Sequence, residues 1–148
     1  DAMGNTYGRT KVIIIVGKGN SNIDQIVESA AKQDKKYVEA DAEPEKGYFY
    51  RSDHFEFAKM GIPALYVDGG IDVRGKNKEF GKLKKNEYTE NHYHSLSDEI
   101  LDDWTYDGMI EDNKILFRVG YAISQHDEWP TWNEGTEFKA VRETMLTK

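Results

Sequence analysis

Residues 50–65 read Tyr-Arg-Ser-Asp-His-Phe-Glu-Phe-Ala-Lys-Met-Gly-Ile-Pro-Ala-Leu, and this stretch predicts a polar turn, a short helix and a strand in succession. The apolar side chains after the turn can cover one side of a helix, for which Ser52 or Asp53 is a suitable N-cap. Gly61 and Pro63 then end the helix, and residues 64–67 are apolar enough for a buried strand. Polar side chains therefore gather beside a core strand, where α/β proteins often carry their chemistry.

The remaining chain extends this pattern in both directions. Residues 11–16 are a β-branched run, which is typical of a strand that is buried on both faces. Residues 69–91 have little periodicity and many Gly, Lys and Asn residues, so we expect a long loop that is a lid, a binding loop or a disordered segment. The predicted strands and helices lie, in chain order, at residues 11–16, 22–33, 37–40, 53–60, 64–67 and 107–124. This order predicts an α/β fold, a three-layer sandwich with a mixed, mostly parallel sheet.

Composition excludes several classes of protein. The chain has 148 residues and a formal net charge of -7, which argues against a nucleic-acid-binding surface. It has no cysteine, so it has neither a disulfide framework nor a thiolate metal site. No apolar run is long enough to span a membrane, and no signal peptide is visible.

Three segments carry a resemblance to a known family. Residues 51–64 read Arg-Ser-Asp-His-Phe-x-Phe-Ala-x-x-Gly-Ile-Pro-Ala, residues 91–99 hold a Tyr-His pair before an Asp, and residues 1–4 read Asp-Ala-Met-Gly. These segments resemble the di-zinc exopeptidases, a family of secreted bacterial aminopeptidases that also includes glutamate carboxypeptidase and glutaminyl cyclase. The resemblance covers nearly the whole chain. It implies the zinc-exopeptidase fold, which is phosphorylase/hydrolase-like.

The resemblance also implies roles for single residues. His94 and Asp1 correspond to zinc ligands of a site that holds two zinc ions when complete. Tyr93 corresponds to a phenol that donates a hydrogen bond to the oxyanion of a tetrahedral intermediate, although a structural tyrosine is an equal alternative. Arg51 and Asp53 correspond to residues that hold the end of the substrate near the metals.

Two alternatives stay open for these positions. Arg51 can equally form a structural ion pair with Asp53 or Glu56. Independently of the family, His92 and His94 lie two residues apart, and on an extended segment both point to the same face and can share one metal ion. Two ligands alone make a weak and unselective site.

A two-zinc centre needs more than these residues provide. It requires a bridging carboxylate and a Glu that takes the proton from the attacking water. The family supplies these groups before the segment that corresponds to Asp1, and this sequence contains no His-x-Asp and no Glu-Glu pair. We therefore expect residues 1–148 to be the C-terminal part of one catalytic domain, without its upstream half and without peptidase activity alone.

For the full-length protein, the resemblance implies a zinc-dependent aminopeptidase, with carboxypeptidase or cyclase chemistry left open. The expected partners are a peptide substrate, the upstream part of the same domain and, because a partial domain exposes apolar surface, a second copy of the chain. The implied location is extracellular or periplasmic. The rival hypothesis is a non-catalytic, peptidase-like interaction module.

Overall fold

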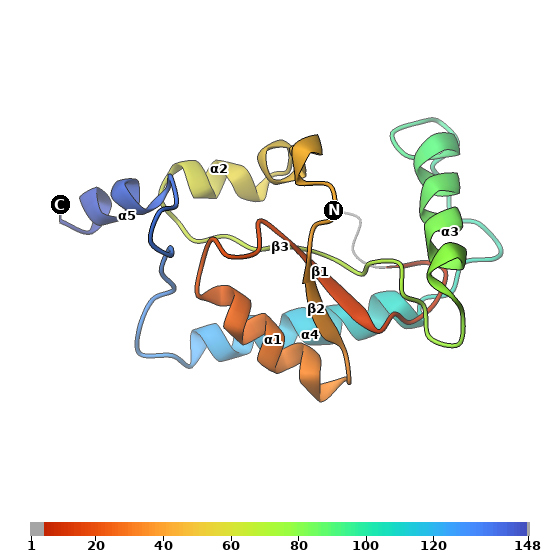
Figure 1. Ribbon diagram of the computed structural model, residues 1–148, viewed down its shortest axis with the longest axis horizontal. Helices are drawn as coiled ribbons and strands as arrows, with labels where there is room; N and C mark the ends of the chain where they lie inside the picture. Colours follow the sequence, from red (N-terminus) through yellow and green to blue (C-terminus); the bar gives the residue numbers. More distant parts are fainter. Residues whose placement is uncertain (1–4, 148) are drawn as a thin grey trace.

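The computed structural model of the protein describes residues 5–147. Figure 1 shows a small sheet with helices packed around it and with α3 standing apart at one side. In chain order the elements are β1 (Val12–Val16), α1 (Ile23–Gln33), β2 (Tyr37–Ala40), the 3₁₀ turns η1 (Pro44–Lys46) and η2 (Tyr48–Arg51), α2 (His54–Lys59), β3 (Tyr66–Asp68), α3 (Lys78–Asn91), α4 (Asp107–Ser124) and α5 (Lys139–Leu146).

The sheet has three strands in the order β2-β1-β3. Val12 of β1 lies opposite Tyr37 in a parallel pairing with β2, and Val16 lies opposite Tyr66 in an antiparallel pairing with β3. The β-branched run of β1 occupies the centre because a strand covered on both faces has no side for polar residues. The predicted α/β fold with a mixed sheet is confirmed.

Helices α1 and α4 pack against one face of β1 (Figure 1). Ile13 and Ile15 point to this face because residues two apart in a strand share a side. They meet apolar side chains that recur at helical spacing on both helices. The buried members of this core are Ile13, Ile15, Ile23, Val27, Ala30, Ala31, Ile115 and Val119.

The segments η2, α2 and the C-terminal region cover the other face near the end of β1. The buried residues there are Val16, Phe49, Ala58, Trp132 and Phe138. Gly61 ends α2 with a φ of 78°, and a Cβ at this residue would lie 2.7 Å from the backbone nitrogen of Arg142. A glycine is therefore required both for the turn and for the close approach of α5.

A buried ionic cluster holds α4 to the start of β2. The ammonium of Lys36 lies 2.5 Å from a carboxylate oxygen of Asp112, 3.0 Å from Glu111 and 3.1 Å from the hydroxyl of Thr10. The side chain of Lys36 is fully buried. Glu111 also pairs with Arg74 at 3.2 Å. Burial raises the pKa of Asp112, although the charge of Lys36 opposes this shift.

The predicted loop over residues 69–91 is wrong for its second half, which forms α3. Asn77 caps this helix because its side chain accepts a hydrogen bond of 3.0 Å from the amide of Phe80. Most other residues of α3 are charged or polar and exposed, so the helix shows almost no hydrophobic periodicity. Gly81 does not break the helix. A Cβ there would collide with the carbonyl of Ile71, so the glycine is the point of closest packing.

The other predicted elements are confirmed with small shifts. The strand expected at residues 64–67 begins two residues later and runs from Tyr66 to Asp68. The helix expected at residues 107–124 has those bounds in the structure. Among the helices formed by residues 5–147, none combines the length and the apolar composition needed to cross a membrane.

Candidate functional site

The turn before α2 is built on a cluster of aromatic rings. The ring of Phe49 is buried, and it meets His54 edge to face at 4.6 Å and Phe55 at 6.2 Å. Tyr66 of β3 lies on another side of His54, with ring centroids 5.3 Å apart. These contacts fix the turn against the sheet and leave its polar residues pointing outward.

Arg51 and Asp53 are both exposed on this turn. In residues 5–147 neither makes a side-chain hydrogen bond or an ion pair, and Glu56 pairs instead with Lys59 at 2.6 Å. The alternative of a structural ion pair between Arg51 and Asp53 or Glu56 is therefore wrong. Both side chains remain open to a ligand, which leaves their predicted role in substrate binding a prediction.

His54 is unusual because both of its ring nitrogens are buried without a hydrogen-bond partner in the part of the chain that the structure describes. Burial lowers the pKa of His54, while the charge of Asp53 acts in the opposite direction. The imidazole therefore lies between two aromatic rings, in surroundings that favour its neutral form.

Tyr93 and His94 lie on the turn that follows α3. Their rings stack with centroids 3.9 Å apart and an interplanar angle of 19°. His94 has a φ of 57°, a left-handed conformation that is uncommon for a residue other than glycine. Both side chains are exposed, and Tyr93 keeps 49% of its surface. A buried structural role for Tyr93 is therefore wrong.

The neighbouring polar residues of this turn bind one another and not His94. The phenol of Tyr88 donates to Asp98 at 2.9 Å, and within residues 5–147 no hydrogen bond joins Asp98 to His94. Burial raises the pKa of Tyr88, and this hydrogen bond raises it further. His92 ends α3 and its Nδ1 lies 2.8 Å from the carbonyl of Ser97. The segment is a helix end and a tight turn, so the extended geometry assumed for a shared His92–His94 metal site is wrong.

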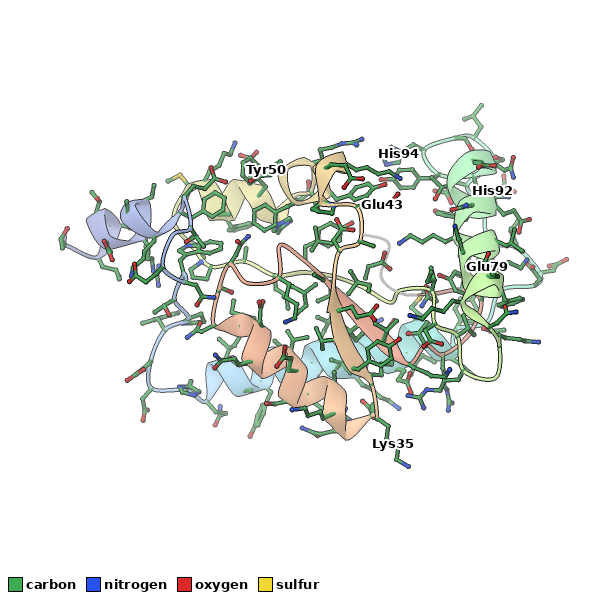
Figure 2. The ribbon with its side chains drawn as sticks, in the orientation of Figure 1. Lys35, Glu43, Tyr50, Glu79, His92 and His94 are labelled. Atoms are coloured by element: carbon green, nitrogen blue, oxygen red, sulfur yellow. The ribbon has the colours of Figure 1, made fainter. Side chains whose placement is uncertain are left out.

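Charges link the two groups of candidate residues. Lys85 of α3 pairs with Asp68 at the end of β3, at 2.5 Å. The pKa of Glu43 in the loop before η1 is lowered, first by its hydrogen bond with Lys46 and then by the charges of Lys85 and Lys82. Figure 2 shows His94 on the side of α3 toward Glu43 and Tyr50.

Burial raises the pKa of the Tyr66 phenol in β3, and the charge of Asp68 raises it further. No hydrogen bond or ion pair within residues 5–147 joins Arg51 or Asp53 to Tyr93 or His94.

The described residues do not form a complete metal site. In residues 5–147 no group of three or more His, Asp or Glu side chains is placed so that it could hold a metal ion. His94 offers one exposed imidazole, and the predicted ligand Asp1 lies outside the described residues. A zinc ion in a protein usually has at least three protein ligands, so this part of the chain alone does not fit the metal.

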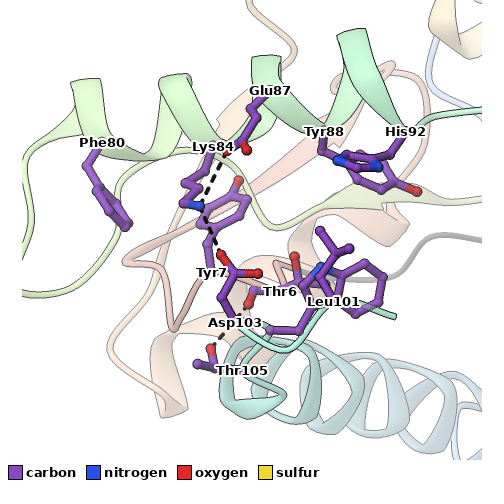
Figure 3. Close-up of a pocket in the computed structure, with 11 residues that line it drawn as sticks. Thr6, Tyr7, Phe80, Lys84, Glu87, Tyr88, His92, Leu101, Asp103 and Thr105 are labelled. Carbon is purple, nitrogen blue, oxygen red and sulfur yellow. Dashed lines mark hydrogen bonds and ion pairs between the residues drawn. The ribbon is translucent and has the colours of Figure 1, made fainter. Parts of the chain in front are cut away.

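A separate cavity of about 290 Å³ lies between α3 and the chain around residues 101–105 (Figure 3). Its wall is partly aromatic, with Tyr7, Phe80, Tyr88 and Trp104. Lys84 bridges Glu87 at 3.3 Å and Asp103 at 3.1 Å at one side of it. The lining includes His92, a residue of the alternative shared metal site, and none of Arg51, Asp53, Tyr93 and His94.

Sequence reasoning missed the contacts that place the turn, chiefly those of Tyr88, His92 and Ser97. A signal for one of them was present. Tyr88 and His92 are four residues apart, a spacing that stacks side chains on one face of a helix, and their rings do stack at 6.2 Å. The signal was lost because this stretch was read as a loop.

Comparison with known proteins gives one result. The family model described as Peptidase family M28 matches residues 1–117, which include all of the predicted site residues. Neither curated proteins nor solved structures give a significant match.

Proposed function

The chain belongs to peptidase family M28, and from that premise we propose that it forms part of the catalytic domain of a zinc-dependent aminopeptidase. Membership of this family implies a hydrolase that acts on peptides. The narrower statement, removal of residues from the amino end of a peptide, rests on the motif at residues 51–54, which resembles the aminopeptidase version most closely.

One observation carries the proposal. Tyr93 and His94 stand exposed and stacked on a hydrogen-bonded turn, on the side of α3 that faces the sheet edge. An exposed imidazole beside an exposed phenol suits a metal ligand next to a hydrogen-bond donor for developing negative charge. A structural pair would be expected to bury these groups or to satisfy them with other side chains.

The proposed roles follow from these positions. His94 and Asp1 would contribute ligands to a zinc site that groups outside residues 5–147 complete. Zinc held there would lower the pKa of a coordinated water and polarise the carbonyl of the substrate. Tyr93 would donate a hydrogen bond to the carbonyl oxygen. Arg51 and Asp53, which make no side-chain hydrogen bond or ion pair within residues 5–147, bind the end of the peptide.

The same proposal extends to partners and location. The partners are a peptide substrate and the remaining part of the catalytic domain, and the location is extracellular or periplasmic. A second candidate function is a non-catalytic interaction module with this fold. It is favoured by the absence of a group of three metal-binding side chains among the described residues.

A zinc titration by calorimetry tests the proposal on this chain and on its His94→Ala variant. We expect weak binding that is lost in the variant. His126→Ala is the matched control, because His126 is exposed and lies after α4, away from the proposed site. Tight binding that survives His94→Ala would overturn the role of His94. No binding by either protein would favour the interaction module.

A second measurement addresses activity. We expect no hydrolysis of an amino-acid p-nitroanilide by this chain alone, because the sequence contains no Glu-Glu pair to supply the general base of the family. Zinc-dependent hydrolysis by residues 1–148 would contradict the incomplete site.

A further inference from the structure

The cavity beside α3 has a wall of aromatic rings (Figure 3). Four half-buried side chains supply these rings, namely Tyr7, Phe80, Tyr88 and Trp104. The rings of Tyr88 and Trp104 form a corner, with centroids 6.5 Å apart and an angle of 67° between their planes. Binding sites for small molecules begin at about 300 Å³, so this cavity of about 290 Å³ suits a ligand, or one end of a ligand, with few heavy atoms.

One face of α3 supplies much of the lining. Phe80, Lys84, Tyr88 and the C-cap residue His92 follow one another at intervals of four residues, and all of them line the cavity. Residues four apart lie on the same side of a helix. The facing wall comes from residues 6–7 and 101–105. The rings and the charge of α3 are therefore presented together, as one surface.

Lys84 leaves no free positive charge in this surface. Its ammonium lies 3.1 Å from Asp103 and 3.3 Å from Glu87, and Figure 3 shows it between the two carboxylates. The hydrogen bond to Asp103, and then that to Glu87, raise the pKa of Lys84, so it keeps its proton. Among the described residues that line the cavity, Lys84 is the only Lys or Arg. One ammonium against two carboxylates leaves an excess of negative charge.

The chain on the far side of the cavity adds to this negative charge. Residues 98–103 read Asp-Glu-Ile-Leu-Asp-Asp and contain no basic residue. Leu101 and Asp103 of this segment line the cavity, and Asp98 accepts the hydrogen bond of the Tyr88 phenol at 2.9 Å. A cleft lined by charge of one sign attracts ligands of the opposite sign. The cavity therefore favours a cation over an anion.

The aromatic wall favours the same kind of ligand. The face of an aromatic ring attracts a cation within about 6 Å of its centre, and Trp does so most strongly. The ammonium of Lys76 already lies 5.3 Å from the centre of the Phe80 ring. Within residues 5–147 no Lys or Arg lies over the ring of Tyr88 or Trp104 in this way. The corner formed by these two rings is thus open to a cation from outside.

We propose that this cavity binds the ammonium or guanidinium group of a small organic cation, held against the rings of Tyr88 and Trp104 and beside the carboxylate of Asp103. Lys84 competes with the ligand for the carboxylates and so limits its affinity. The inference goes beyond the proposed function and does not depend on it, because the binding requires neither a metal ion nor Tyr93 and His94.

An NMR titration with three probes tests the class of ligand. Choline is the cation, neohexanol is its uncharged isostere, and acetate is the anion. We expect choline to move the indole N–H signal of Trp104 saturably and to leave those of Trp129 and Trp132, which do not line the cavity, in place. Neohexanol should bind about 10-fold more weakly, because it lacks the charge that the rings attract. Equal binding of neohexanol, or tighter binding of acetate, would overturn the inference.

Two variants of the wall identify the groups that hold the cation, with backbone amide signals of α3 as the readout. Trp104→Leu keeps an apolar side chain without the ring and should weaken choline binding about 10-fold. Asp103→Asn removes one carboxylate at an exposed position and should weaken it about 3-fold. Trp129→Leu and Asp102→Asn make the same changes at exposed positions outside the cavity and should have no effect. Unchanged affinity in both wall variants would contradict the proposed contacts.

A third variant, Lys84→Met, separates a cation site from an anion site. It leaves Glu87 and Asp103 without their shared partner, so choline should bind about 3-fold more tightly. An anionic ligand would instead lose the only ammonium in the lining and bind more weakly. Lys82→Met is the control, because Lys82 is exposed on the same helix and does not line the cavity. Weaker choline binding by Lys84→Met would overturn the inference.

A fourth probe, N-acetylarginine methylamide, distinguishes two sources of such a cation. Tighter binding of this probe than of choline would identify a basic side chain of a peptide as the ligand, and the reverse would identify a free quaternary ammonium compound. If neither probe moves the signal of Trp104, the inference fails. The proposed function is judged separately by zinc binding to His94→Ala, so the failure of one leaves the other standing.

Discussion

Two regions of the molecule are held together by different forces. The sheet region, formed by β1, α1 and α4, has a core of fully buried apolar side chains, with Val27 at 0% and Ile115 at 1% exposed. The α3 region, formed by α3 and the turn at residues 91–98, buries only Gly81 along its helix. Its order comes from a cap, ion pairs and the hydrogen bonds of the turn. The fold is therefore fixed by burial, and the candidate site is placed by local polar contacts.

The largest expected effect is the removal of the buried cation in the sheet region. Lys36→Met leaves the carboxylate of Asp112 buried without its partner, and breaking a buried pair in this way costs about 3–5 kcal/mol. The free energy of unfolding measured by urea denaturation should fall by this amount.

A surface pair provides the control for this change. Lys11 pairs with Asp72 at 3.0 Å, but its side chain is 47% exposed, so Lys11→Met should cost less than about 1 kcal/mol. The double variant Lys36→Met/Asp112→Asn should recover part of the loss, because it removes the stranded charge. Equal losses of unfolding free energy in the two single variants would show that water reaches the charges of the Lys36 cluster.

A pair of aliphatic truncations sharpens the contrast between the regions. Ile115→Ala in the sheet region leaves a cavity between α4 and β1 and should lower the free energy of unfolding by about 2–5 kcal/mol. Leu96→Ala in the turn should change it by less than about 0.5 kcal/mol, because the side chain of Leu96 is 101% exposed. Denaturation of both variants under one set of conditions is the measurement. A large loss of unfolding free energy in Leu96→Ala would mean that the side chain of Leu96 is buried in solution.

The same contrast explains what the sequence could predict of the fold. Residues 11–16, 22–33 and 107–124 carry apolar side chains at strand or helix spacing because they face the core, so their structure follows from their pattern. Residues 78–91 form a helix with no apolar stripe. The helix propensity of this segment comes from its many Lys and Glu residues, and Asn77 caps its start. Gly81 lies inside this helix, where a glycine costs stability, and its close contact with Ile71 explains its presence.

The sequence predicts which residues belong to the candidate site, but it does not predict how their side chains are arranged in space. The Tyr93–His94 pair and the motif at residues 51–54 were recognised from their resemblance to a family, which the family model confirms at family level. The conformation of His94, the bond from His92 to Ser97 and that from Tyr88 to Asp98 depend on where α3 ends. Because the sequence predicts a loop here and not a helix, it gives no helix end from which these contacts could be predicted.

The cap of α3 is the next test, at about 1 kcal/mol. Asn77→Ala removes the acceptor for the amide of Phe80, and the loss of such a cap typically costs 0.5–2 kcal/mol, or about 1 kcal/mol. Because α3 has little buried surface, the loss should appear as local opening, seen as faster hydrogen exchange of α3 amides than of α1 amides. Asn86→Ala, at an exposed position inside the helix, is the control and should not speed exchange. Equal acceleration in α1 would mean that the two regions unfold together.

The smallest expected effect concerns His54, which lies on the aromatic cluster between the two regions. Burial lowers its pKa in the folded state, so the unfolded chain binds the proton more tightly as the pH falls through the ordinary value near about 6.5. The stabilising contribution of neutral His54 is complete above that pH and is lost below it. The unfolding free energy should fall by well under about 1.4 kcal/mol per pH unit, because the residue is only partly buried and Asp53 opposes the shift. His54→Phe should flatten the fall in unfolding free energy between pH 7.5 and pH 5, relative to the wild type. Parallel curves for the wild type and His54→Phe would mean that both ring nitrogens find partners in solution.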